Sequence, residues 1–135
     1  MRDLYSNVGI RAVIAPVVVG DNTATVGTVI DRAGFESVTY LIATGTLADA
    51  DATFAVLLEE SDASGSGFAA VDDVHLLGTE ADAGFTFADD GEVRKLGYRG
   101  LKRYTRLTIT PTGNSGSAPI AALAVLGHPA DAPVS

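Results

Sequence analysis

Residues 103–127, RYTRLTITPTGNSGSAPIAALAVLG, contain two extended segments separated by a turn. In residues 103–110, apolar Leu107 and Ile109 alternate with threonine, so both are predicted to point into a core. In residues 118–127, apolar side chains occupy both alternating sets, which is typical of a strand that is central in a sheet or covered by a partner. The Pro, Gly, Asn and Ser residues between the two segments favour a turn. The stretch therefore predicts β structure.

The rest of the chain follows the same pattern of short segments rich in Val, Ile, Thr, Tyr and Phe, bounded by Gly, Asp, Asn, Ser or Pro. Helical spacing of apolar residues is nearly absent. We expect strands at residues 11–19, 23–31, 35–46, 52–60, 67–77, 84–88, 93–98, 103–110 and 118–127. The predicted fold class is all-β: one domain over residues 1–135, built as an antiparallel, jelly-roll-like sandwich or barrel.

The two ends of the chain differ from this pattern. The first ten residues show little alternation, and the closing GHPADAPVS contains two prolines, which oppose both helix and interior strand. We expect residues 1–10 to form an extended N-terminal arm and residues 128–135 an extended C-terminal tail. Each arm either frays or becomes ordered on a neighbouring subunit.

Composition restricts the classes of function. The chain has 135 residues, of which 47% are hydrophobic and 19% charged, and no cysteine, so disulfides, thiolate metal sites and a thiol nucleophile are excluded. No apolar window approaches the roughly 18 residues that a membrane-spanning helix needs, and we expect no membrane partner. The formal net charge of −8 disfavours direct binding of nucleic acid.

Charge is distributed unevenly along the chain. Residues 33–93 contain thirteen acids and no Lys or Arg, whereas residues 94–106 contain six of the nine bases and no acid. Two main interpretations of the basic segment stay open, beside a minor third in which its bases and tyrosines contact nucleic acid. Its side chains either pair with acids of the same domain, which contributes little to stability, or face an acidic surface of another protein and fix its register.

Residue patterns for catalysis or metal binding are weak. Neither His75 nor His128 lies in a nucleophile elbow, a zinc-binding helix motif or a phosphate loop. His75 with Asp72 and Asp73 could bind a metal, but turn chemistry explains these carboxylates equally well. Adjacent Glu59 and Glu60 point to opposite faces of a strand. We therefore expect no enzyme, no catalytic residue, no metal and no cofactor.

Four segments together resemble the small decoration, or cement, proteins of tailed-bacteriophage heads. These are MRDLYSN (residues 1–7), LLEESDASGSGFAAV (57–71), GYRGLKRYTRLTITPTG (97–113) and AVLGHPADAP (124–133). The resemblance implies a β-rich virion protein, commonly a homotrimer, that lies on the capsid exterior and connects subunits of the major capsid protein. It also implies synthesis in the cytoplasm of the bacterial host.

The resemblance does not assign binding residues, so the candidates follow from physical arguments. Basic and tyrosine side chains of residues 97–116 are expected on a β-hairpin or strand-turn-strand edge that meets an acidic neighbour, while an apolar N-terminal arm is buried on the partner. The candidate partner-binding residues are Tyr5, Val8, Ile10, Arg94, Lys95, Tyr98, Arg99, Lys102, Arg103, Tyr104 and Arg106.

Two alternatives to the decoration protein remain. A tail-tube or head–tail joining subunit is also a small β domain, but it forms rings. A carbohydrate-binding β-sandwich is disfavoured because the chain has no tryptophan and only four tyrosines to stack on sugar rings.

Overall fold

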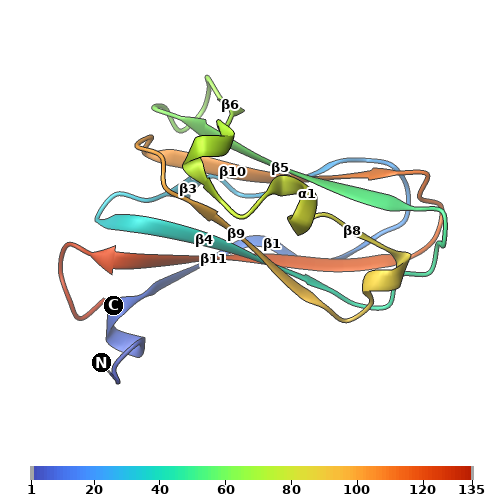
Figure 1. Ribbon diagram of the computed structural model, residues 1–135, viewed down its shortest axis with the longest axis horizontal. Helices are drawn as coiled ribbons and strands as arrows, with labels where there is room; N and C mark the ends of the chain where they lie inside the picture. Colours follow the sequence, from blue (N-terminus) through green and yellow to red (C-terminus); the bar gives the residue numbers. More distant parts are fainter. Residues whose placement is uncertain (1, 135) are drawn as a thin grey trace.

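The computed structural model describes residues 2–134 as two antiparallel β-sheets packed face to face (Figure 1). Sheet A contains, in spatial order, β1 (Gly9–Val19), β11 (Ala118–Pro129), β4 (Phe35–Thr44), β9 (Val93–Tyr98) and β7 (Leu76–Leu77). Sheet B contains β2 (Thr25–Val26), β3 (Ile30–Asp31), β10 (Tyr104–Thr112), β5 (Thr53–Ser61), β6 (Ala69–Ala70) and β8 (Phe85–Thr86). The predicted all-β sandwich is confirmed.

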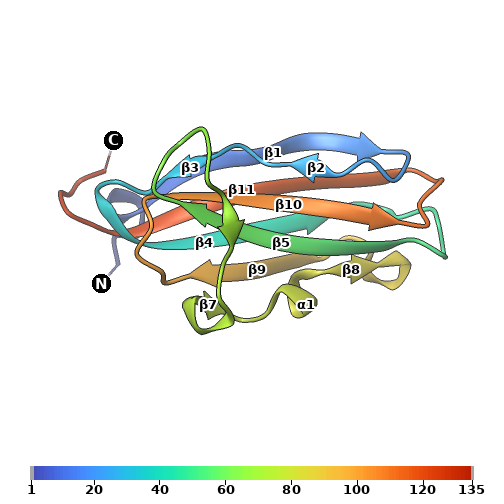
Figure 2. The ribbon, with the colours of Figure 1, turned by 90° about the horizontal axis from the view of Figure 1, so that it is seen from above.

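The long strands alternate between the two sheets along the chain. β4 lies in sheet A, β5 in sheet B, β9 in sheet A, β10 in sheet B and β11 in sheet A. This alternation is the arrangement of a jelly roll. Figure 2 shows the long strands of both sheets running along one long axis of the domain.

Strand β11 has the central position that its sequence predicts, because β1 pairs with one of its edges and β4 with the other. One alternating set of its side chains is buried in the core: Ala118, Ile120, Ala122, Ala124 and Leu126. Leu107 and Ile109 of β10 are fully buried on the facing sheet, as predicted. Phe54 and Phe85 stack within the same core, with ring centroids 4.7 Å apart.

Three expected strands are reduced to strands of two residues each. The expected strand at 23–31 is interrupted at Gly27, whose N–H bonds the carbonyl of Leu107 in sheet B, whereas the next N–H, of Thr28, bonds Val13 of sheet A. The expected strand at 67–77 leaves sheet B after β6, forms a 3-10 helix at Asp73–His75 and joins sheet A as β7. At 84–88, β8 passes into a second 3-10 helix, Phe87–Asp89, which Asp89 caps by accepting from the N–H of Thr86.

Residues 97–116 form a strand-turn-strand and not a hairpin. β9 pairs with β4 and β7 in sheet A, whereas β10 pairs with strands of sheet B, so the turn between them crosses from one sheet to the other. The backbone N–H of Lys102 donates to the Tyr98 hydroxyl at 3.0 Å, which closes this crossing.

The terminal segments are more ordered than the predicted arms. β1 begins at Gly9, and Ile10 pairs with Val125, so residues 9 and 10 belong to sheet A. β11 continues to Pro129. A 3-10 helix covers Tyr5–Asn7, and the carbonyl of Ser6 accepts from the N–H of Val134 at 2.8 Å. The two terminal segments therefore lie together at one end of the sandwich (Figures 1 and 2), while Met1 and Ser135 lie outside the described residues.

Candidate protein-interaction surfaces

The outer face of sheet A is apolar over four adjacent strands. Its outward residues form rows across β1, β11, β4 and β9, and we call these rows the apolar face. The rows are Ile10, Val125, Thr39 and Gly97; then Ala12, Leu123, Leu41 and Lys95; then Ala121, Ala43 and Val93; and finally Val18 with Pro119.

Several large side chains of the apolar face are exposed to solvent. Ile10 is 54% exposed, Val18 60%, Val93 68% and Leu123 44%. Lys95 is the one charged residue of these rows. Beside Val18, a shallow hollow of about 380 Å³ is lined by further apolar residues of β1, β4 and β11. Contiguous exposed apolar surface of this kind makes this face a candidate interaction surface.

The outer face of sheet B has a different chemistry. Threonines occupy successive outward positions of β10, and Thr112 pairs with Thr53 of β5. Further along, Arg106 pairs with Glu59 across the same two strands. This face also exposes Val26 at 58% and Leu57 at 37%, both beside Thr108, so apolar surface is more extensive on sheet A but is not confined to it.

The long edge of sheet A is protected against addition of another strand. β1 contains Pro16, which has no N–H to donate, and its pairing with β11 shifts register between Ala12 and Ile14 and again between Ile14 and Val17. The carbonyl of Val13 already accepts from Thr28 at 2.9 Å. Contact with another protein is therefore favoured through the face of this sheet.

The folded chain separates the six cations of residues 94–106. Arg94, at the start of β9, pairs with Asp89 and Glu92, each at 2.7 Å. Lys95 lies on the apolar face, and the guanidinium of Arg99 donates to the carbonyl of Val74 at 3.1 Å. The remaining three cations lie at one end of sheet B. Pairing with acids of the same domain, one of the two main interpretations left open by the sequence, is thus observed for Arg94.

The three cations of sheet B also pair with acids of the same chain. The ion pairs are Lys102–Asp62 at 2.7 Å, Arg103–Asp31 at 2.9 Å and Arg106–Glu59 at 2.8 Å. We call these six residues, together with Tyr104, the charged end.

Two aromatic rings support the guanidinium groups of the charged end. Arg103 makes two hydrogen bonds to Asp31, each 2.9 Å, and lies 5.1 Å from the ring centroid of Tyr104. Arg106 lies 4.3 Å from the ring centroid of Phe68. The Arg103 hydrogen bond holds the pKa of Asp31 below its usual value, so this acid stays ionised. The charged end is therefore a preformed array of both signs, and it lies at the same end of the sandwich as the terminal segments (Figure 1).

Tyr98 is not available to a partner, in contrast to the sequence-based expectation, because it is only 1% exposed. Its hydroxyl donates to Oε1 of Glu60 at 2.7 Å. Burial and this hydrogen bond raise the pKa of Tyr98 to about 12. Of the other candidates, Tyr5 is 90% exposed, Val8 is half-buried beside it, and Ile10 belongs to the apolar face.

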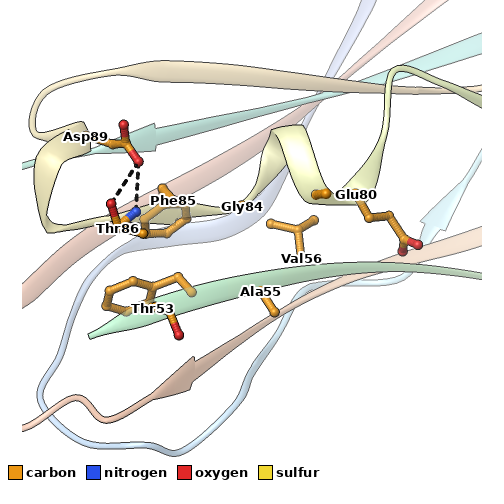
Figure 3. A pocket seen from close by; sticks show the side chains of 10 residues that line it. Thr53, Ala55, Val56, Glu80, Gly84, Phe85, Thr86 and Asp89 are labelled. Carbon is orange, nitrogen blue, oxygen red and sulfur yellow. Dashed lines mark hydrogen bonds between the residues drawn. The ribbon is translucent and has the colours of Figure 1, made fainter. Parts of the chain in front are cut away.

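A groove of about 370 Å³ lies between β5 and the short helix α1 (Glu80–Ala83), as Figure 3 shows. The two carboxylates that line the groove, Glu80 and Asp89, make hydrogen bonds or ion pairs with other residues of the same chain. Glu80 accepts from the N–H of Leu58 at 2.7 Å, and Asp89 accepts from the N–H of Thr86 at 2.8 Å and pairs with Arg94. Both acids stabilise the backbone around the groove.

The histidines differ in surroundings. Nδ1 of His128 lies 2.8 Å from the hydroxyl of Ser37 at the surface, and no hydrogen bond joins a carboxylate to this imidazole among residues 2–134. His75 ends the 3-10 helix that begins at Asp73. Within the described part of the chain, no three His, Asp or Glu side chains are grouped to hold a metal ion. Nor does any described helix have the length and apolarity to cross a bilayer.

Comparison with known proteins gives distant structural similarity only. No family model and no curated protein matches the sequence. The C-terminal family 22 carbohydrate-binding module of Clostridium thermocellum Xyn10B has a TM-score of 0.42 and 10% identity, covering 94% of this chain and 98% of that one. The N-terminal CBM22-1–GH10 modules of Xyn10B, complexed with xylohexaose, give 0.41 and 9%, covering 98% of this chain and 28% of that one. What is shared is the β-sandwich.

Sequence reasoning missed most of the apolar face. It included Ile10 and Lys95, but not Leu41, Val93 or Leu123. One signal was present in the sequence, because residues 118–127 are apolar on both faces and a strand that is central or covered by a partner was expected there. The contributions of β4 and β9 depend on which strands flank β11, and that is a property of the tertiary fold.

Proposed function

We propose that the protein is a structural subunit of a virus particle, a decoration protein that binds the exterior of a bacteriophage head and stabilises contacts between major capsid protein subunits. The observation that carries the proposal is the apolar face, a preformed surface suited to assembly with protein. The resemblance of four segments to decoration proteins supports it. Such a protein is made in the cytoplasm of the bacterial host and functions on the capsid exterior.

The charged end and the exposed Tyr5 supply the contact with the shell. Both lie at one end of the sandwich and combine fixed charges with aromatic surface (Figure 1). Charged groups held in place by their own partners fix the orientation of a contact more than its strength. A capsid repeats the same surface many times, so a modest contact gains from multivalency when the bound protein is oligomeric.

Binding to purified heads that lack the protein tests the proposal. We expect saturable binding, and Arg106→Gln should weaken it by about 10- to 100-fold, because a hydrogen bond to a charged group contributes about 1.5–3 kcal/mol and about 1.4 kcal/mol is a factor of ten. Arg94→Gln is the matched control. Both arginines pair with acids and have similar side-chain exposure, 29% and 26%, but Arg94 lies away from the charged end.

The possible results test the charged end as the contact surface and the decoration role separately. Equal binding of wild type and Arg106→Gln to heads would show that the charged end is not the contact with the shell. Absence of any binding to heads would refute the decoration role. Labelling of intact particles at the tail or the head–tail junction would instead favour the tail-tube or joining subunit.

A further inference from the structure

We infer that the apolar face is covered by the same face of a second copy of this chain, so that the protein is a two-fold dimer with its A sheets packed together. The inference rests on the proposed function, because it names the partner of the surface that carries that function. It leaves the charged end and the terminal segments available to the shell. A two-fold dimer also differs from the homotrimer that the resemblance implies.

The area of the apolar face fits this partner. The named rows run about 27 Å along β1, about 20 Å along β11 and about 14 Å along β4 and β9. At a strand spacing of about 4.8 Å they present about 360 Å² of flat sheet surface. Two copies would bury about 700 Å² of flat sheet surface in total, which is the size of a weak interface. The hollow beside Val18 adjoins this surface and adds to it. A patch of this size is typical of the largest apolar patch on a monomer, and such patches are often functional.

The distribution of charge favours a second copy over a charged partner. Each chain has a formal net charge of −8, so two copies repel through most of their surfaces. The rows of the apolar face contain no carboxylate, and their single cation, Lys95, lies on β9, next to the short edge strand β7. Its long side chain can reach solvent at the rim. Two copies therefore meet on this face without opposing acids.

The mixture of large and small side chains on the apolar face also suits packing against a second copy. Leu123 and Leu41 are neighbours in the central row, and Ala12, Ala43 and Ala121 lie around them. Large side chains of one sheet can then fit over small ones of the other, as in sandwiches whose sheets pack about 10 Å apart. Because Pro16 and the register shifts of β1 oppose strand addition, the face is the favoured surface for association.

Light scattering during size-exclusion chromatography tests the dimer directly. Wild type should have twice the chain mass of 13.8 kDa. Leu123→Lys should weaken association at least about 100-fold, because it buries an unpaired charge in the interface. Thr110→Lys is the matched control, since it places the same charge on an outward position of β10, a strand flanked on both sides in sheet B, and it should remain dimeric.

A cross-linking measurement tests the same interface and does not depend on whether the fold tolerates a lysine at position 123. The chain has no cysteine, so Leu123→Cys carries a single thiol. A short bifunctional maleimide should link two Leu123→Cys chains and leave Thr110→Cys unlinked. Dimeric wild type without cross-linking at residue 123 would show that association uses another surface and would overturn the inference.

The remaining outcomes distinguish this inference from the proposed function. A wild-type mass of one chain at about 0.1 mM, where a micromolar dimer would be saturated, or a trimeric mass, overturns the two-fold dimer. A dimer that ignores heads refutes the decoration role and leaves the interface standing. A monomer that binds heads and loses binding on Leu123→Lys would show that the shell covers the apolar face.

Discussion

Tyr40 and Thr105 join the two sheets through a hydrogen bond between their hydroxyl groups. Tyr40 lies on β4 of sheet A and Thr105 on β10 of sheet B, and both are fully buried. Burial raises the pKa of Tyr40 well above its ordinary value. Each hydroxyl therefore satisfies the other within an apolar core, and the hydrogen bond links the two sheets.

A double-mutant cycle should reveal this coupling. Tyr40→Phe and Thr105→Val each leave one buried hydroxyl without its partner, so each should lower the free energy of unfolding by about 1–3 kcal/mol. The double variant should lose clearly less than the sum, because it leaves neither hydroxyl behind. Urea unfolding at one fixed protein concentration measures all four proteins. Additive losses would show that the bond does not couple the sheets.

Gly27 is required where the chain passes from β2 to β3. A Cβ there would lie 2.6 Å from Cγ1 of Val13 and 2.8 Å from the carbonyl oxygen of Leu107. Gly27→Ala should therefore lower the free energy of unfolding by about 1–3 kcal/mol through overpacking. Gly20→Ala is the control, because nothing lies within 4 Å of its Cβ and its backbone is outside the left-handed region. Thermal unfolding compares the two, and equal midpoints would contradict this account of Gly27.

Tyr98 should make the protein sensitive to alkali. Its pKa is raised to about 12 in the folded chain, against about 10 for an unfolded tyrosine. The folded state thus holds the phenolic proton more tightly, and the resulting stabilisation is complete below about pH 10 and is lost as the pH rises through about 12. Tyr98→Phe should make the fall in stability over this window less steep. Part of the fall should remain, because the pKa of buried Tyr40 is also raised.

Urea unfolding at a series of alkaline pH values measures that slope. Tyr98→Phe also removes the hydrogen bond to Glu60, so a lower stability at neutral pH is expected and is not the readout. An unchanged slope between pH 10 and 12 would show that Tyr98 is not the titrating group.

Much of the architecture could be predicted from local pattern. The inward direction of Leu107 and Ile109 followed from alternation, because successive strand residues point to opposite faces. The central place of β11 was one of two alternatives that followed from its apolar residues on both faces. The interrupted segment around Gly27 could not be predicted in the same way. Its two successive N–H groups bond to different sheets, and that depends on where those sheets lie.

The sequence by itself determined the fold class, the core strands and the clustering of cations within residues 94–106. Only the tertiary structure decided that these cations separate to different surfaces, that Tyr98 is buried, and that outward residues of four strands join into one apolar face. The physical reason is that alternation along a strand sets the direction of each side chain, whereas its neighbours are set by hydrogen bonding between strands distant in the chain. β1 and β11 lie at opposite ends of the sequence, and their pairing completes the apolar face.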